Sequence, residues 1–229
     1  MISDSYSENS VAGTVGVKNI LSFEVEDIFH AESHDVESIE TKSRIIPNLI
    51  HLLDHLDEQK TTATFFVLGW VARRFPEVVA LIDTRGHEVA SHGWYHSDIR
   101  KMSSEKLVIE LERSRTILED IVQKPVFGFK AAGEYFGREH LSLYRHVASA
   151  GYRYDCSLIS HGIPARQNQP FTVRFEEGGS IIAVPQSTVK KLGVSLRFSE
   201  RLRLFPGWFV KRAIHSLNRR GYPAMINMK

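Results

Sequence analysis

Hydrophobic residues recur along the chain in two alternating patterns. Runs of β-branched and aromatic residues predict buried strands, and apolar residues at helical spacing predict amphipathic helices. The clearest helix follows Ser103, which can cap it, and carries its apolar residues along one side. The expected strands cover 19–29, 61–70, 126–133, 152–159, 181–185 and 223–228, and 87–96 is expected to be a short strand that runs into a loop. The expected helices cover 43–60, 76–86, 103–123, 138–151 and 207–221.

Strands that alternate with helices over most of a chain favour a parallel sheet with crossover helices. Six or seven such units indicate an α/β fold, a distorted and incomplete (β/α) barrel with mainly parallel strands. We expect residues 1–18, rich in Ser, Gly and Asn, to form a disordered tail and residues 19–229 to form one domain. The stretch 161–179 is expected to be irregular. Residues 195–209 are expected to start an amphipathic helix, with a lid or a partner surface as the alternative.

Composition and charge narrow the class of protein. The chain has 229 residues, 42% hydrophobic and 24% charged, which suits a globular domain with a full core. Its 29 Lys and Arg against 27 Asp and Glu predict a mixed solvated surface and no nucleic-acid partner. No apolar run reaches the roughly 20 residues of a membrane span. With no signal-peptide pattern and only Cys156 as a thiol, the sequence predicts a cytoplasmic protein.

Charged and imidazole side chains fall at or just past the predicted strand ends. In a parallel barrel these ends meet on one face, where reactive groups collect. The sequence therefore predicts one site that draws on several strands. Its candidate members are Glu24, Glu26, Asp27, His92, His96, Lys130 and Asp155.

The histidines His92 and His96 are candidates for metal ligands. Their spacing alone is weak support, because the chain has 11 histidines, and Gly93 between them argues against a regular helix. Two imidazoles need a third ligand to hold an ion such as zinc. Glu24 and Glu26 point to one side of an extended strand and supply carboxylates that would repel one another without a cation nearby. The alternative is a solvated strand end beside two surface histidines.

Four segments resemble successive motifs of the NodB-type polysaccharide deacetylases, carbohydrate esterase family 4: "SFEVEDIFH", "TTATFFVLGWVARRFPEVVALIDTRGHEVASHGWYH", "FGFKAAG" and "GYRYDCSL". The similarity runs from Asn19 to Lys229, and the branch it resembles most is associated with exopolysaccharide and exosortase gene clusters. It implies a distorted (β/α) barrel and a hydrolase of carbon–nitrogen bonds other than peptide bonds. Such an enzyme removes N-acetyl groups from a glycan with a divalent metal, usually zinc.

The resemblance also implies roles for the candidate residues. His92 and His96 match the two metal-binding histidines of the family. Glu24 then takes the position of the catalytic base, and Glu26 or Asp27 that of the metal ligand. A second register makes Glu26 the base and Asp27 the ligand.

Further positions match residues that support the reaction. Lys130 stands where the family has an arginine that holds the base, and the backbone N–H near Gly133 would stabilise the oxyanion. Asp155 matches an acid that supports the site, although a strand-end acid paired with a nearby basic residue is an equal alternative. Trp94 and Tyr95 are candidates for the sugar-binding surface.

Several positions depart from the family pattern. Glu24 replaces an aspartate, Lys130 an arginine and Ala132 a proline, and the last strand ends in Met228 and Lys229 where the family has a leucine and a catalytic histidine. The general acid is thus missing, or the chain is truncated. Three interpretations stay open: a deacetylase with altered activity, a degenerate member that binds metal or glycan without efficient turnover, and a barrel with another role, such as a partner in polysaccharide assembly.

Overall fold

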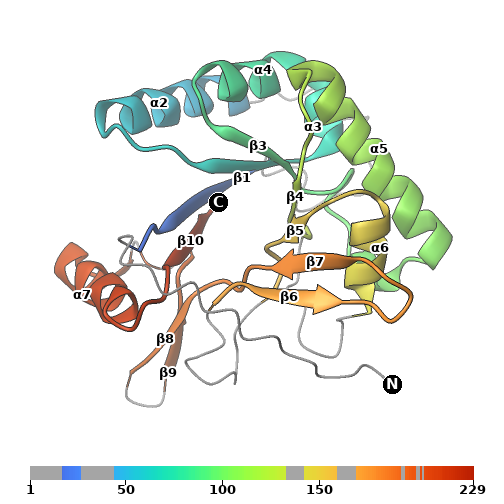
Figure 1. Cartoon of the computed structure of the whole chain (residues 1–229). Coiled ribbons are helices and arrows are strands. Elements are labelled where there is room, and N and C mark those ends of the chain that lie inside the picture. The colour runs from blue at the N-terminus through green and yellow to red at the C-terminus, as the bar shows by residue number, and fades with distance from the viewer. Residues whose placement is uncertain are drawn as a thin grey trace.

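The computed structural model describes residues 17–26, 44–132, 142–158, 169–191, 194–199, 202 and 204–229 (Figure 1). Its strands are β1 Ile20–Val25, β2 Thr64–Val67, β3 Glu88–Ser91, β4 Gly128–Phe129, β5 Tyr154–Asp155, β6 Phe171–Arg174, β7 Ser180–Ala183, β8 Thr188–Lys191, β9 Val194–Arg197 and β10 Met225–Met228. Its helices are α2 Ile45–Glu58, α3 Gly69–Arg74, α4 Pro76–Thr84, the short 3₁₀ turn η2 Ile99–Lys101, α5 Ser104–Val122, α6 Leu143–Ser149 and α7 Gly207–Asn218.

Eight strands form one curled sheet in the order β10-β1-β2-β3-β4-β5-β7-β6. All neighbours are parallel except β6 and β7, which pair antiparallel at one edge. The two edge strands do not pair with each other, so the sheet is an open half-barrel. The incomplete (β/α) barrel predicted from the sequence is confirmed. No helix in the described part of the chain is long and apolar enough to cross a membrane.

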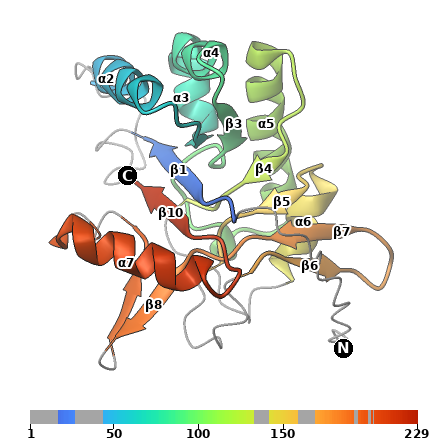
Figure 2. The same cartoon turned by 60° about the vertical axis from the view of Figure 1, so that its left-hand side comes forward.

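Helices α2 to α5 cover the outer face of this sheet (Figures 1 and 2). Their apolar stripes are fully buried at Leu53, Ile82 and Leu118 and pack with strand residues such as Phe65 in the main core. Ser103 caps α5 by accepting a hydrogen bond from the backbone N–H of Lys106, as the sequence predicts. A smaller core lies under α7, away from these helices.

The parallel register brings several strand ends to the same edge. Val67 of β2 lies opposite Ser91 of β3, which lies opposite Phe129 of β4, which in turn lies opposite Asp155 of β5. Because each of these residues ends its strand, the chain leaves β3 and β4 at His92 and Lys130, and Glu26 follows β1 on the same edge. The expected convergence of strand ends is therefore present.

Three expectations about elements were wrong. Strand β2 stops at Val67, and Gly69 already begins α3. The stretch expected to be irregular contains β6, which pairs with β7 and alternates half-buried and exposed residues. The expected amphipathic helix at 195–209 is wrong because its first residues belong to β9, which forms a hairpin with β8, and α7 begins only at Gly207.

Candidate metal centre

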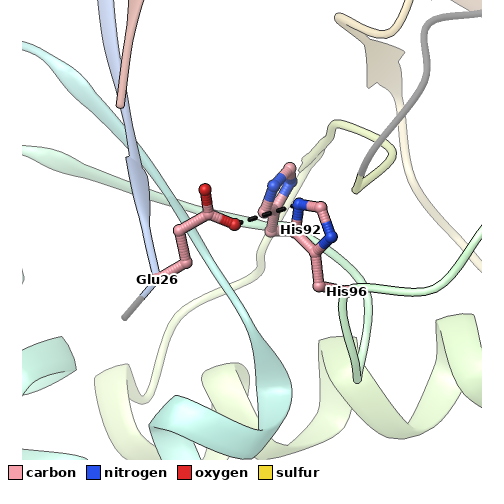
Figure 3. A group of neighbouring side chains, drawn as sticks. All are labelled: Glu26, His92 and His96. Atoms are coloured by element: carbon pink, nitrogen blue, oxygen red, sulfur yellow. Dashed lines mark ion pairs between the residues drawn. The ribbon is translucent and has the colours of Figure 1, made fainter. Parts of the chain in front are cut away.

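Three side chains from two strand ends come together at this edge of the sheet. The ligand atoms of Glu26, His92 and His96 lie within 4.8 Å of one another, and Glu26 Oε2 is 3.1 Å from His96 Nε2 (Figure 3). His92 is fully buried, and the other two side chains are about one-tenth exposed. Glu26 Oε2 and both Nε2 atoms lack a hydrogen-bond partner among the described residues. Buried polar atoms without partners are costly, and a cation between them would remove that cost.

The imidazole of His92 is oriented by the backbone. Its Nδ1 lies 2.8 Å from the carbonyl oxygen of Lys130 and therefore donates to it. With the proton on Nδ1, Nε2 keeps its lone pair and faces Glu26 and His96. A hydrogen bond of this kind from the remote ring nitrogen is the usual support of a metal-binding histidine.

The turn between the two histidines depends on glycines. Gly93 has a φ of +82°, a conformation that other residues rarely adopt. Its carbonyl oxygen accepts a hydrogen bond from the backbone N–H of Gly69, and the carbonyl of Trp94 accepts one from Trp70. The start of α3 therefore holds the histidine turn in place, and the prediction that this pair does not lie on a regular helix is confirmed.

A second carboxylate lies beside the cluster and is bound from several sides. Glu24 Oε1 accepts from Lys130 Nζ at 2.6 Å and from Asn227 Nδ2 at 2.7 Å. Its other oxygen, Oε2, is 3.6 Å from His92 Nε2 and 3.2 Å from Lys229 Nζ. Lys130 and Glu24 are each 1% exposed at the side chain, so this ion pair is fully buried. Lys130 and Asn227 thus occupy Oε1 of Glu24, and Oε2 faces Glu26, His92 and His96.

Both carboxylates are held in the ionised form. Burial alone would raise the pKa of Glu24, but the contact with His92 and the charges of Lys130 and Lys229 hold that pKa well below its ordinary value. For Glu26, burial is likewise outweighed by His96, His92 and Lys229, and the pKa falls to about 2. Two charged carboxylates and two imidazoles at one strand edge form a donor set that suits a divalent cation.

Asp155 lies behind Lys130 and is fully buried. It accepts hydrogen bonds from the backbone N–H of Ser157 at 2.8 Å and from the Ser157 hydroxyl at 2.9 Å. That hydroxyl in turn accepts from the backbone N–H of Ala131. Burial raises the pKa of Asp155 to about 7, against the opposing effects of Ser157, Tyr144 and Lys130. Asp155 therefore braces the Lys130–Ala131 turn and does not reach the cluster itself.

The family model that describes polysaccharide deacetylases matches residues 47–154, which hold both histidines and Lys130. The matched residues make up just under half of the chain. A peptidoglycan-N-acetylglucosamine deacetylase of Bacillus cereus is 29% identical over 102 residues, 44% of this chain and 46% of that protein. A chitooligosaccharide deacetylase of Rhizobium leguminosarum is 36% identical over 63 residues, 28% of this chain and 29% of that protein. The matches span less than half the length of these two relatives.

The fold of this chain is shared by solved structures. A Mycobacterium smegmatis protein assigned to the polysaccharide deacetylases superposes with a TM-score of 0.72 at 20% identity, covering 95% of this chain and 79% of its own. The Puue allantoinase superposes with a TM-score of 0.65 at 17% identity, covering 95% of this chain and 78% of its own. At such identities the likeness shows the fold alone, and enzymes of different names share it.

Two aromatic residues lie between the two histidines in the sequence. Trp94 is 3% exposed, with the Arg113 guanidinium 3.5 Å from its ring centroid on one side and Gly69 packed against the ring. Against the expectation from sequence, this burial leaves the indole no free face for a sugar. Tyr95 is half-buried and meets Trp94 edge-on, so part of its ring remains accessible.

Some site residues lie outside the described residues or were missed. Asp27 and Gly133 fall outside them, so the choice between Glu26 and Asp27 as ligand rests on the geometry of Glu26 alone. Asn227 and Lys229 were not predicted. Asn227 is fully buried on β10, beside β1, and accepts from the Ser22 hydroxyl while it donates to Glu24. The sequence signal available for Asn227 was its single amide within the otherwise apolar strand pattern "AMINM".

Proposed function

We propose that this protein is a metal-dependent deacetylase that removes N-acetyl groups from a glycan. The observation that carries the proposal is the group Glu26, His92 and His96, with three inward-facing ligand atoms that have no hydrogen bond, beside the ionised Glu24. Two imidazoles and one carboxylate are a ligand set found in catalytic zinc sites, which keep a further position open. We therefore infer zinc as the most suitable ion.

A divalent cation held by these three residues would supply Lewis acidity toward an acetamide carbonyl and would lower the pKa of a coordinated water. Glu24 Oε2 would accept the proton of the attacking water, because it faces the cluster while Lys130 and Asn227 hold Oε1. Lys130 and Asn227 thus fix the orientation of the base. The Lys229 ammonium, 3.1 Å from Glu26 Oε1, offsets the negative charge of the two glutamates.

Space for a substrate lies beside the carboxylates. A cavity of about 310 Å³ borders Glu24, Glu26 and Lys229 and reaches the start of α2, where Arg44 and Asn48 line it. Polar and apolar groups that converge beside a catalytic cluster are typical of small-ligand sites. We infer that Arg44 and Asn48 bind hydroxyl or amide groups of the sugar.

Acetate release from N-acetylglucosamine oligomers tests the proposal. The full chain, stripped with chelator, should release no acetate, and added zinc should restore release. Glu24→Gln should abolish release while the protein still binds zinc, whereas His55→Ala, at an exposed position on α2, should behave like the wild type. Bound zinc without acetate release from chitooligosaccharides and peptidoglycan fragments would replace the proposal by the degenerate, binding-only interpretation.

A further inference from the structure

An exposed patch on and before α7 combines apolar and cationic side chains. We call Leu204, Phe205, Trp208, Lys211, Arg212, His215 and Arg219 the α7 patch. Leu204 is 77% exposed, Trp208 66% and Phe205 38%, which makes them three of the most exposed large hydrophobic residues in the described part of the chain. The rings of Phe205 and Trp208 both contact Phe209, so the aromatic side chains form one group.

The part of the α7 patch that lies on the helix and at its end is a single stripe. Trp208, the adjacent pair Lys211 and Arg212, His215 and Arg219 recur at helical spacing of three to four residues and line a shallow hollow of about 580 Å³. The opposite stripe, with Ala213 and Leu217, is buried in the small core. The fold therefore does not need the outer stripe for packing, and its aromatic residue is not explained by stability.

The charge of this end of the chain differs from the rest. Residues 201–229 contain 7 Lys and Arg and no Asp or Glu. Residues 1–200 therefore contain 22 Lys and Arg against 27 Asp and Glu. A chain with a net charge of +2 thus has an acidic body and a basic end. Such an asymmetry favours an anionic partner at the α7 patch.

We propose that the α7 patch binds the surface of a bilayer that contains anionic lipids. Lysine and arginine attract anionic headgroups, and tryptophan, phenylalanine and leucine beside them enter the boundary between headgroups and acyl chains. The aliphatic Leu204 favours a bilayer over an acidic polymer, because an acidic glycan or nucleic acid offers it no apolar environment. Binding of this kind is peripheral and needs no spanning segment.

The position of α7 suits such an interface. Figures 1 and 2 show α7 at the edge of the molecule, on the side away from α5. The helix precedes β10, and Asn227 of β10 and Lys229 just after it contact Glu24, so the membrane-facing element and the candidate metal centre are connected by one short segment. The proposal does not depend on deacetylase activity.

Sedimentation of the full chain with vesicles tests the proposal. Vesicles of phosphatidylcholine mixed with phosphatidylglycerol should bind the protein, those of phosphatidylcholine alone should bind it far more weakly, and salt should reduce binding. Lys211→Gln with Arg212→Gln should weaken binding roughly thirtyfold, at about 1 kcal/mol for each cation near an anionic surface. Trp208→Ser should weaken it by roughly tenfold or more.

Matched variants elsewhere serve as controls. Ile109→Ser removes an exposed apolar residue on α5, and Lys101→Gln with Lys106→Gln removes two exposed cations; none of them should alter binding. The tryptophan emission should shift to the blue on vesicle binding in the wild type but not in Trp208→Phe, which should still bind. Equal losses in the control variants, no binding to the anionic vesicles, or binding to an acidic polysaccharide or nucleic acid in their place would overturn the proposal.

Discussion

Replacing Lys130 by methionine is the sharpest test of the buried charges in the site. The variant leaves the Glu24 carboxylate 1% exposed and without the ammonium that lies 2.6 Å from its Oε1. Removing one partner of a buried ion pair costs about 3–5 kcal/mol. Because Asn227 and Lys229 still contact Glu24, we expect a loss near the lower end, about 3 kcal/mol at neutral pH.

Urea unfolding of the metal-free protein measures this loss through the shift of the midpoint at constant slope. The folded-state pKa of Glu24 is lowered, so the stability from its ionised form is present above the ordinary glutamate pKa and is lost as the pH falls below it. The deficit of the variant should therefore shrink in acid.

Two further variants complete the Lys130 measurement. Glu24→Gln combined with Lys130→Met should cost less than the sum of the two single changes, because the double variant leaves no unpaired buried charge. Lys101→Met, at a side chain that is 84% exposed, should change stability by no more than about 0.5 kcal/mol. A solvent-exposed ion pair contributes no more than about 1 kcal/mol. A loss of unfolding free energy below that value for Lys130→Met would therefore refute the assignment of a buried Lys130–Glu24 pair.

Three other changes test parts of the same network. In Gly69→Ala, the new Cβ would lie 2.6 Å from Trp94 Cε3, so we expect a loss of about 1–3 kcal/mol in urea unfolding and weaker zinc binding in a calorimetric titration; unchanged zinc affinity would contradict this. Asn227→Asp places a carboxylate 2.7 Å from Glu24 and should cost about 2 kcal/mol at pH 7 but much less near pH 4, as measured by urea midpoints at both pH values. Burial raises the pKa of Asp155 to about 7, so the stability that its protonated form contributes in acid is lost as the pH rises through 7. Asp155→Asn should remove this loss of roughly 4 kcal/mol, at about 1.4 kcal/mol per pKa unit, and parallel pH curves for the two proteins would show the assignment to be wrong.

The elements with strong periodicity were predictable from the sequence. Helix α5, with its serine cap and apolar stripe, and strands β1 and β10 lie where the pattern predicts them. The β8–β9 hairpin was not predicted, because Lys190 and Lys191 interrupt any apolar run and the hairpin lies outside the main sheet. The pairing of β6 with β7 depends on contacts across a turn, which local patterns do not reveal.

The candidate site was predictable where metal-binding residue types directly follow predicted strands. His92, His96 and Glu26 follow strand ends and meet in space, as expected from a parallel sheet. The contacts of Asn227 and Lys229 with Glu24 were not predictable, since they depend on β10 returning to pair with β1 across 200 residues of chain. The burial of Trp94 depends likewise on Arg113 and Gly69 from other helices. The cytoplasmic location and the exopolysaccharide-associated branch stay predictions.

Zinc binding by the purified full chain tests the central claim most directly. Calorimetric titration of the chelator-stripped protein should show a single equivalent of zinc bound, and His92→Ala, His96→Ala and Glu26→Gln should each weaken that binding at least tenfold. His215→Ala, at an exposed histidine outside the cluster, should bind zinc as the wild type does. Equal zinc affinity in the wild type and in the His92→Ala, His96→Ala double variant would contradict the assignment of a metal centre at this edge of the sheet.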